Sequence, residues 1–170
     1  MPRARTLSDE AIHATIRKML ADGGDKAVSF GTVSQATGLA ASTLAQRFAT
    51  RDGMVHAALL DGWVRLSALT EAAEAEVPLG SKQVPALLKQ VAKDHAGAIA
   101  LLLHHLRDPD LRAAAQAWRI RMEQAIALRL GGDRAAEAAA MVFALWQGRM
   151  LWSDAGEPPF RLKDALRRLS

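Results

Sequence analysis

Hydrophobic residues recur every three or four positions along most of the chain, which is the spacing of amphipathic helices. Ile12, Ile16, Met19 and Leu20 recur at the spacing of a first helix, which Thr6 or Ser8 can cap. Gly23 and Gly24 follow these residues and predict where this helix stops.

Two short helices and a long one are predicted next. Ser29 can cap a helix that ends at Gly38, a second short helix covers residues 40–48, and Thr50 can cap a long helix from Arg51. The residues expected to face inward from the two short helices are Phe30, Val33, Ala36, Leu44 and Phe48.

The second half of the chain also has helical spacing throughout. One apolar stripe runs over residues 84–106, and Gly97 leaves open whether it forms one helix or two. Asp108 and Pro109 are a cap and a first helical residue. The inner face of that helix is expected to hold Leu111, Ala115, Trp118, Met122 and Ile126. A further helix is predicted from Asp133 to about Ser153, and a short amphipathic one near the end of the chain.

The helix from Asp133 has almost no polar side. A helix that is apolar all round must be buried all round, and a twofold copy of the chain is the most economical partner for its second face. The alternative is the central helix of a monomeric bundle. The predicted dimer interface comprises Met141, Leu145, Gly148, Trp152, Leu162 and Leu166.

The composition supports an all-α fold and bears on the cellular location of the protein. Alanine is abundant, tyrosine is absent and β-branched residues are few, which favours helices. Because cysteine is absent, disulfides and thiolate metal sites are excluded. The longest apolar run, Ala96–Leu103, is far shorter than the roughly 20 residues of a membrane span. We expect a cytoplasmic protein without a membrane partner. The net charge of +4 mildly favours an anionic partner.

The segment Val33–Phe48 has the order short helix, glycine turn, short helix, which is the helix-turn-helix pattern. Its second helix carries Ser42, Thr43, Gln46 and Arg47 beside a stripe of apolar residues. A recognition helix needs this division, because one stripe is buried and the other meets base edges and phosphates. The competing explanation is an ordinary solvated helix face.

Residues 8–60 resemble the N-terminal domain of the tetracycline-repressor (TetR) family of bacterial transcription regulators. The match rests on "VSQATGL" followed by T-L-x-x-x-F-x-x-R-D, within Ala27–Met54. The resemblance implies an all-α fold, with a three-helix DNA-binding domain over residues 1–53 and a helical ligand-binding and dimerisation bundle over residues 54–170. The chain departs from the family at Ala40, where a serine is usual, and at Ala45 and Arg47, where aromatic residues commonly contact phosphates.

These observations assign candidate roles at the DNA. Ser42, Thr43 and Gln46 are expected to face base edges, and Gln46 can pair with adenine through two hydrogen bonds. Arg47 is expected to hold a phosphate rather than a guanine. The side chains expected to hold the DNA backbone are Ser29, Thr32 and Arg51. Arg3 and Arg5 form either a flexible arm that enters the minor groove or a disordered terminus.

The resemblance also implies a pocket for a small, often apolar, effector among the C-terminal helices. The candidate lining residues are His95, His104, Trp118, Met122, Trp146 and Arg149. Each has a simpler explanation: Trp118 and Met122 are spaced like core residues, and His95 lies on an apolar stripe. The neighbours His104 and His105 point apart on a helix, so neither a metal site nor a cofactor is predicted.

The function predicted from the sequence is a homodimeric, sequence-specific transcriptional regulator. It is expected to bind a near-palindromic site in double-stranded DNA and to act as a repressor that a small effector releases. The alternative is a helical protein-interaction module that keeps the fold without ligand sensing or specific DNA reading, as Ala40 and Ala45 suggest. The sequence contains no recognisable set of nucleophile and base, no glycine-rich phosphate-binding loop and no metal-ligand spacing, so an enzyme is not predicted.

Overall fold

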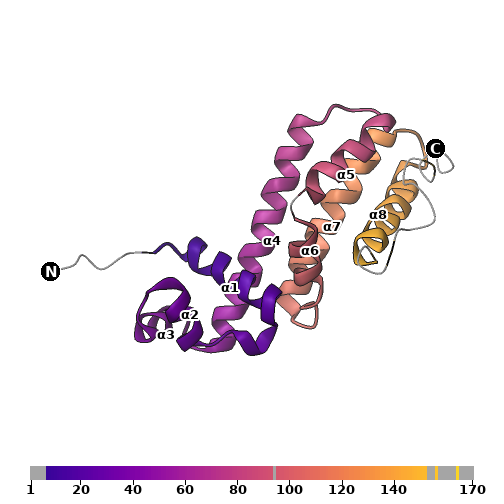
Figure 1. Ribbon diagram of the computed structural model, residues 1–170. Coiled ribbons are helices and arrows are strands. Elements are labelled where there is room, and N and C mark those ends of the chain that lie inside the picture. Colours follow the sequence, from indigo (N-terminus) through magenta and orange to yellow (C-terminus); the bar gives the residue numbers. More distant parts are fainter. Residues whose placement is uncertain (1–6, 94, 153–155, 157–163, 165–170) are drawn as a thin grey trace. The chain divides into compact units, whose positions relative to one another are not determined.

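The computed structural model describes residues 7–93, 95–152, 156 and 164, and every regular element in that part of the chain is helical (Figure 1). The expected all-α fold is confirmed. The elements are α1 (Asp9–Gly23), η1 (Asp25–Ala27), α2 (Phe30–Thr37), α3 (Ala41–Phe48), α4 (Arg51–Glu76), η2 (Ser81–Gln83), α5 (Val84–Ala92), α6 (Ala96–Leu103), α7 (Pro109–Leu130) and α8 (Ala135–Leu151). Within these described helices, none combines the length and apolar character needed to cross a membrane.

The chain divides into two compact units. Unit 1 comprises Met1–Arg65 and Leu101–Ala114, and unit 2 comprises Leu66–Ala100 and Ala115–Ser170. The division falls inside α4 and α7, whereas the boundary expected after residue 53 falls inside the first turn of α4. The predicted final helix, with Leu162 and Leu166, lies outside the described residues, as do Arg3 and Arg5.

Unit 1 begins with the helix that the sequence predicts. Ser8 caps α1, because its Oγ accepts a hydrogen bond from the amide of Ala11 at 3.3 Å. Ile12, Ile16 and Leu20 are buried, and α1 ends at Gly23. The periodicity and the end signals therefore located this helix correctly.

The two short helices differ from the prediction at one position. Val33 and Leu44 are fully buried, Phe30 and Phe48 are half-buried, but Ala36 is exposed. The expectation for Ala36 was wrong because the inner stripe of α2 passes through Thr37 instead. The Thr37 hydroxyl donates to the carbonyl of Val33 at 2.7 Å, which satisfies this polar group beside the core.

Gly62 marks a close approach of three helices inside unit 1. A Cβ at this position of α4 would lie 2.8 Å from Cδ2 of Leu102 on α6 and 3.1 Å from Cδ of Arg17 on α1. Arg17 also donates from Nη1 to the carbonyl of Ala58 at 2.8 Å and pairs with Asp61 at 2.5 Å. These contacts attach α1 to α4.

The helix over residues 84–106 is interrupted. α5 ends at Ala92 and α6 begins at Ala96, so the break lies just before Gly97, which occupies the first turn of α6. Asp108 caps α7 as predicted, since its Oδ1 accepts hydrogen bonds from the amides of Asp110 at 2.9 Å and Leu111 at 3.1 Å. The predicted inner face of α7 is confirmed as buried, from Leu111 to Ile126.

An aromatic cluster fills the core of unit 2. Trp118, Phe143 and Trp146 have ring centroids 5.7 to 6.2 Å apart, in tilted or edge-to-face contacts. The indole nitrogen of Trp118 donates to Oγ1 of Thr70, a fully buried hydroxyl, at 2.9 Å. The cluster joins α7 and α8 to α4.

α8 begins at Ala135 after Arg134, two residues later than the predicted start at Asp133. No side chain caps this end of the helix. One face, with Val142, Phe143 and Trp146, is buried. The opposite side leaves Met141 43%, Leu151 54% and Trp152 70% exposed within the single chain.

A buried arginine donates hydrogen bonds to backbone carbonyls at the C-terminal end of α4. Arg129 of α7 is 3% exposed, and its guanidinium donates to the carbonyls of Ala125, Glu74 and Val77 at 2.7 to 3.1 Å. The last carbonyls of a helix have no partner within it, so Arg129 supplies two of those that α4 and the following turn need. The sequence did not single out this residue.

Replacing Arg129 should therefore destabilise the protein. We expect Arg129→Leu to lower the free energy of unfolding by about 2 to 3 kcal/mol, because buried carbonyls lose a charged donor. Urea unfolding at a fixed protein concentration measures the effect. Arg134→Leu is the matched control. Arg134 is exposed and, among the described residues, its side chain pairs with Glu137 alone, so its loss should cost under about 0.5 kcal/mol. Equal losses in the two variants would contradict this role.

Candidate nucleic-acid interface

Gly38 makes the turn between α2 and α3. Its backbone is left-handed, with φ 75° and ψ 7°, and its amide donates to the carbonyl of Ser34 at 2.8 Å. Glycine adopts this conformation without a Cβ penalty. The Ser34 hydroxyl then donates to the carbonyl of Leu39 at 2.6 Å, which fixes the path of the chain into α3. The turn sets the angle between the two short helices.

Ser29 and Thr32 close the first turn of α2 with a capping box. The Oγ of Ser29 accepts from the amide of Thr32 at 3.1 Å, and Oγ1 of Thr32 accepts from the amide of Ser29 at 2.9 Å. Thr32 also donates to the carbonyl of Ala27 at 2.9 Å. Both residues are exposed, and their hydroxyls are already engaged in holding the helix end.

α3 presents a polar face above a buried leucine. Ser42 and Gln46 are exposed, Thr43 is half-buried, and Leu44 has no exposed surface. Within the described part of the chain, the side chains of Ser42, Thr43 and Gln46 make no hydrogen bonds. Their donors and acceptors are therefore available to an external partner.

The two arginines next to this face contact the protein itself. Nη1 of Arg47 donates to the carbonyl of Leu7 at 3.1 Å and pairs with Asp9 at 2.9 Å, which ties α3 to the start of α1. Arg51 donates from Nε to the carbonyl of Val28 at 3.2 Å and from Nη2 to the carbonyl of Asp25. It also pairs with Asp52 at 2.8 Å. The sequence pattern did not reveal these contacts.

The six residues proposed for an effector pocket are divided between the two units. His104 belongs to unit 1 and is exposed, whereas the other five belong to unit 2. Trp118, Met122 and Trp146 lie in the buried core, and His95 and Arg149 are half-buried. The burial of Trp118 and Met122 favours the core explanation for these two residues.

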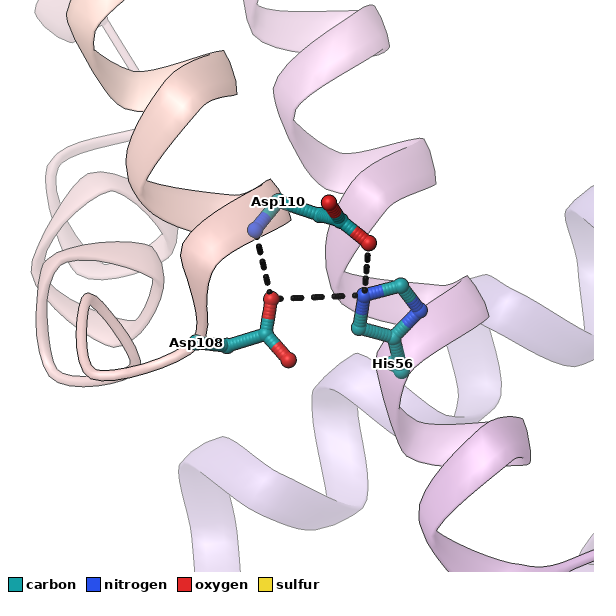
Figure 2. A group of neighbouring side chains, drawn as sticks. All are labelled: His56, Asp108 and Asp110. Carbon is teal, nitrogen blue, oxygen red and sulfur yellow. Dashed lines mark hydrogen bonds and ion pairs between the residues drawn. The ribbon is translucent and has the colours of Figure 1, made fainter.

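A cluster that the sequence analysis missed lies elsewhere in unit 1. Nε2 of His56 on α4 is 3.4 Å from Oδ1 of Asp108 and 3.5 Å from Oδ2 of Asp110 (Figure 2). The amide of Leu111, aided by the Asp110 amide and by His56, holds the pKa of Asp108 below its usual value, although partial burial opposes this shift. No local motif signals this cluster, because the histidine and the aspartates are far apart in the sequence.

Two serines of the helix-turn-helix should separate folding from recognition. Ser29→Ala removes the cap of α2, so we expect it to lower the free energy of unfolding by about 1 kcal/mol. Ser42→Ala removes an exposed hydroxyl that has no partner in the described part of the chain, so its effect should stay within about 0.5 kcal/mol. Thermal or urea unfolding of the two variants distinguishes them. A larger loss for Ser42→Ala would show that this residue supports the fold.

Comparison with known proteins identifies the fold. No protein-family model and no curated protein matches the sequence. A transcriptional regulator from Rhodococcus sp. RHA1 is 21% identical, with a TM-score of 0.74 over 96% of this chain and 94% of that chain. The TetR-family regulator PfmR from Thermus thermophilus is 19% identical, with a TM-score of 0.62 over 92% and 93% of the two chains. The multidrug binding protein EbrR, solved with imidazole, is 21% identical, with a TM-score of 0.64 over 96% of each chain. Over nearly its full length, the chain has the fold of the TetR-family transcriptional regulators.

Proposed function

We propose that the chain is a homodimeric, sequence-specific DNA-binding regulator of transcription that acts in the cytoplasm and represses its target until a small effector releases it. The exposed polar face of α3 is the observation that carries this proposal. That face has unused hydrogen-bonding groups, rests on the buried Leu44, and belongs to a helix-turn-helix in a fold shared with transcriptional regulators. The proposal is of a binding protein rather than an enzyme.

In this proposal the side chains on α3 divide into two roles. Ser42, Thr43 and Gln46 read base edges in the major groove, and Arg47 holds a phosphate. The ion pair of Arg47 with Asp9 is exposed, and such pairs are worth at most about 1 kcal/mol, so exchange of Asp9 for a phosphate costs little. Ser29, Thr32 and Arg51 lie at the starts of α2 and α4 and would set the register on the DNA backbone.

The exposed side of α8 supports a dimer. Met141, Leu145, Gly148 and Trp152 are the proposed interface residues among the described ones. Apart from the nearby backbone of α8 itself, no atom of the described residues lies within 4 Å of a Cβ placed at Gly148. A copy of the chain on this side would cover the exposed apolar surface. Two recognition helices would then read half-sites about 34 Å apart on a near-palindromic duplex.

The effector of this proposal is a small apolar molecule that binds among the helices of unit 2. Imidazole in EbrR is an example of a small ligand in a protein of this fold. In unit 2 of this chain, the candidate contacts are His95, Trp118, Met122, Trp146 and Arg149, whereas the sixth candidate, His104, belongs to unit 1. An effector acts only through a difference in its affinity for the two states of the dimer.

A protein-interaction module is the second candidate. Ala45 offers no polar reach on α3, and Arg47 and Arg51 already hold groups of the protein itself. These contacts are compatible with a helix-turn-helix that docks on another protein instead of DNA. Binding experiments with DNA separate the two candidates.

Substitution of Gln46 tests the recognition helix. Duplexes selected from a random pool by the purified chain would provide the preferred sequence, and fluorescence anisotropy would measure affinity across salt concentrations. We expect Gln46→Ala to weaken binding to the preferred duplex by about 1 to 3 kcal/mol, because one base loses its hydrogen-bonding partner. Arg47→Ala should weaken binding to all sequences and reduce the salt slope by about 1.

Gln124→Ala is the matched control, since Gln124 is an exposed glutamine on α7 in unit 2. It should bind like the unmodified chain. Selection that enriches no sequence, with a folded chain, would favour the interaction module. Equal losses for Gln46→Ala and Gln124→Ala would rule out α3 as the reading helix.

Trp152→Glu tests the dimer. The side chain is 70% exposed in one chain, so we expect the variant to fold but to lose its partner, since a charge in an apolar interface is costly. Light scattering after size-exclusion chromatography should show the mass fall from two chains to one. Leu79→Glu changes another exposed apolar residue, between α4 and η2, and should remain dimeric. A monomeric unmodified chain would contradict the proposal.

A further inference from the structure

Three ligand-type side chains converge where α4 meets the start of α7, within unit 1. His56 comes from the second turn of α4, and Asp108 and Asp110 flank Pro109 at the N-terminus of α7 (Figure 2). One imidazole nitrogen of His56 and one carboxylate oxygen from each aspartate all lie within 4.8 Å of one another. Both carboxylates face the same atom, Nε2 of His56.

The separations in this cluster are those of long ion pairs, and they also match the spacing of ligands around a metal ion. Nε2 of His56 lies 3.4 Å and 3.5 Å from the two carboxylate oxygens, whereas N–H···O bonds fall between about 2.7 and 3.2 Å. Nitrogen and oxygen ligands lie about 2.0 to 2.2 Å from Zn²⁺, and two ligands of a tetrahedral ion are then about 3.4 Å apart. Both measured edges have this length.

Charge alone would not identify a metal site here. The N-terminus of α7 stabilises carboxylates, and Asp108 is accounted for as its cap. Capping, however, does not explain why Asp110 turns its carboxylate toward the same imidazole nitrogen, which has a single proton to donate when neutral. A cation between the three groups would satisfy both carboxylates at once.

Backbone hydrogen bonds fix one ligand of the cluster, and a pocket adjoins the cluster. The amides of Asp110 and Leu111 hold the Asp108 carboxylate in place, as hydrogen-bonded partners of metal ligands usually do. His56 and Asp108 also line a pocket of about 690 Å³ in unit 1. His104 and His105 line the same pocket but do not belong to the cluster, so the open coordination positions would face solvent.

We propose that His56, Asp108 and Asp110 bind a divalent transition-metal ion, with Zn²⁺ as the probe. An imidazole nitrogen among the ligands favours Zn²⁺ and its first-row neighbours over Mg²⁺ and Ca²⁺, which prefer oxygen ligands throughout. The ion would link α4 to the start of α7. The spacing of histidines in the sequence predicted no metal site, and this proposal does not depend on the proposed function at DNA.

Calorimetric titration of the chelator-treated full chain with ZnCl₂ tests the proposal. We expect one Zn²⁺ per chain and no comparable binding of Mg²⁺. His56→Gln and Asp110→Asn should each lower the affinity for Zn²⁺ by at least about tenfold, the lower range seen when groups around a metal are removed. Asp110 is 75% exposed at its side chain and does not cap α7, so Asp110→Asn should keep the fold, which circular dichroism checks.

His104→Gln and His105→Gln are the matched controls, because they remove imidazoles from the same pocket but not from the cluster. They should bind Zn²⁺ like the unmodified chain. Binding that survives in both cluster variants, or that is lost in a control variant instead, would overturn the assignment. Failure of the unmodified chain to bind Zn²⁺ would overturn it as well.

Discussion

The attachment of α1 to α4 is the contact on which the rest of unit 1 depends. Arg17 pairs with Asp61 and donates to the carbonyl of Ala58, at a place where Gly62 lets α1 and α6 approach α4 closely. α1 in turn packs against α2, and Arg47 of α3 holds the first turn of α1. The short helices α2 and α3 could not hold a fixed position alone, because helices of eight residues are marginal in water.

The same attachment explains how α3 can expose so many polar groups. Leu44 is its only fully buried residue, so most of α3 contributes little to the core. Its position comes instead from the Gly38 turn and from the contacts of Arg47 and Arg51 with neighbouring backbone carbonyls. A helix held from its ends and by one central side chain keeps a whole face free for a partner.

Local signals in the sequence were sufficient for most of the fold, including the polar face of α3, whose residues are adjacent in the chain. A cap acts within three residues of its own position, so the sequence located the caps at Ser29, Thr50 and Asp108 and indicated Ser8 as one of two candidates for the cap of α1. Periodicity could not show that α8 buries one face only, because its pattern is the same whether the second face meets its own chain or another. Contacts between distant segments depend on which helices meet and at what rotation, so the sequence could not predict the partners of Arg129 or the cluster around His56.

Asp108 has two roles at once, as the cap of α7 and as a member of the cluster with His56. Its carboxylate begins α7 through the amides of Asp110 and Leu111, and the same oxygen faces His56. Each residue turns a helix by about 100°, so a one-residue shift in the start of α7 would carry Asp110 away from the imidazole. The residue at which α7 starts therefore also determines the geometry of the cluster. An insertion or deletion near Pro109 that shifts this start would also disrupt the cluster.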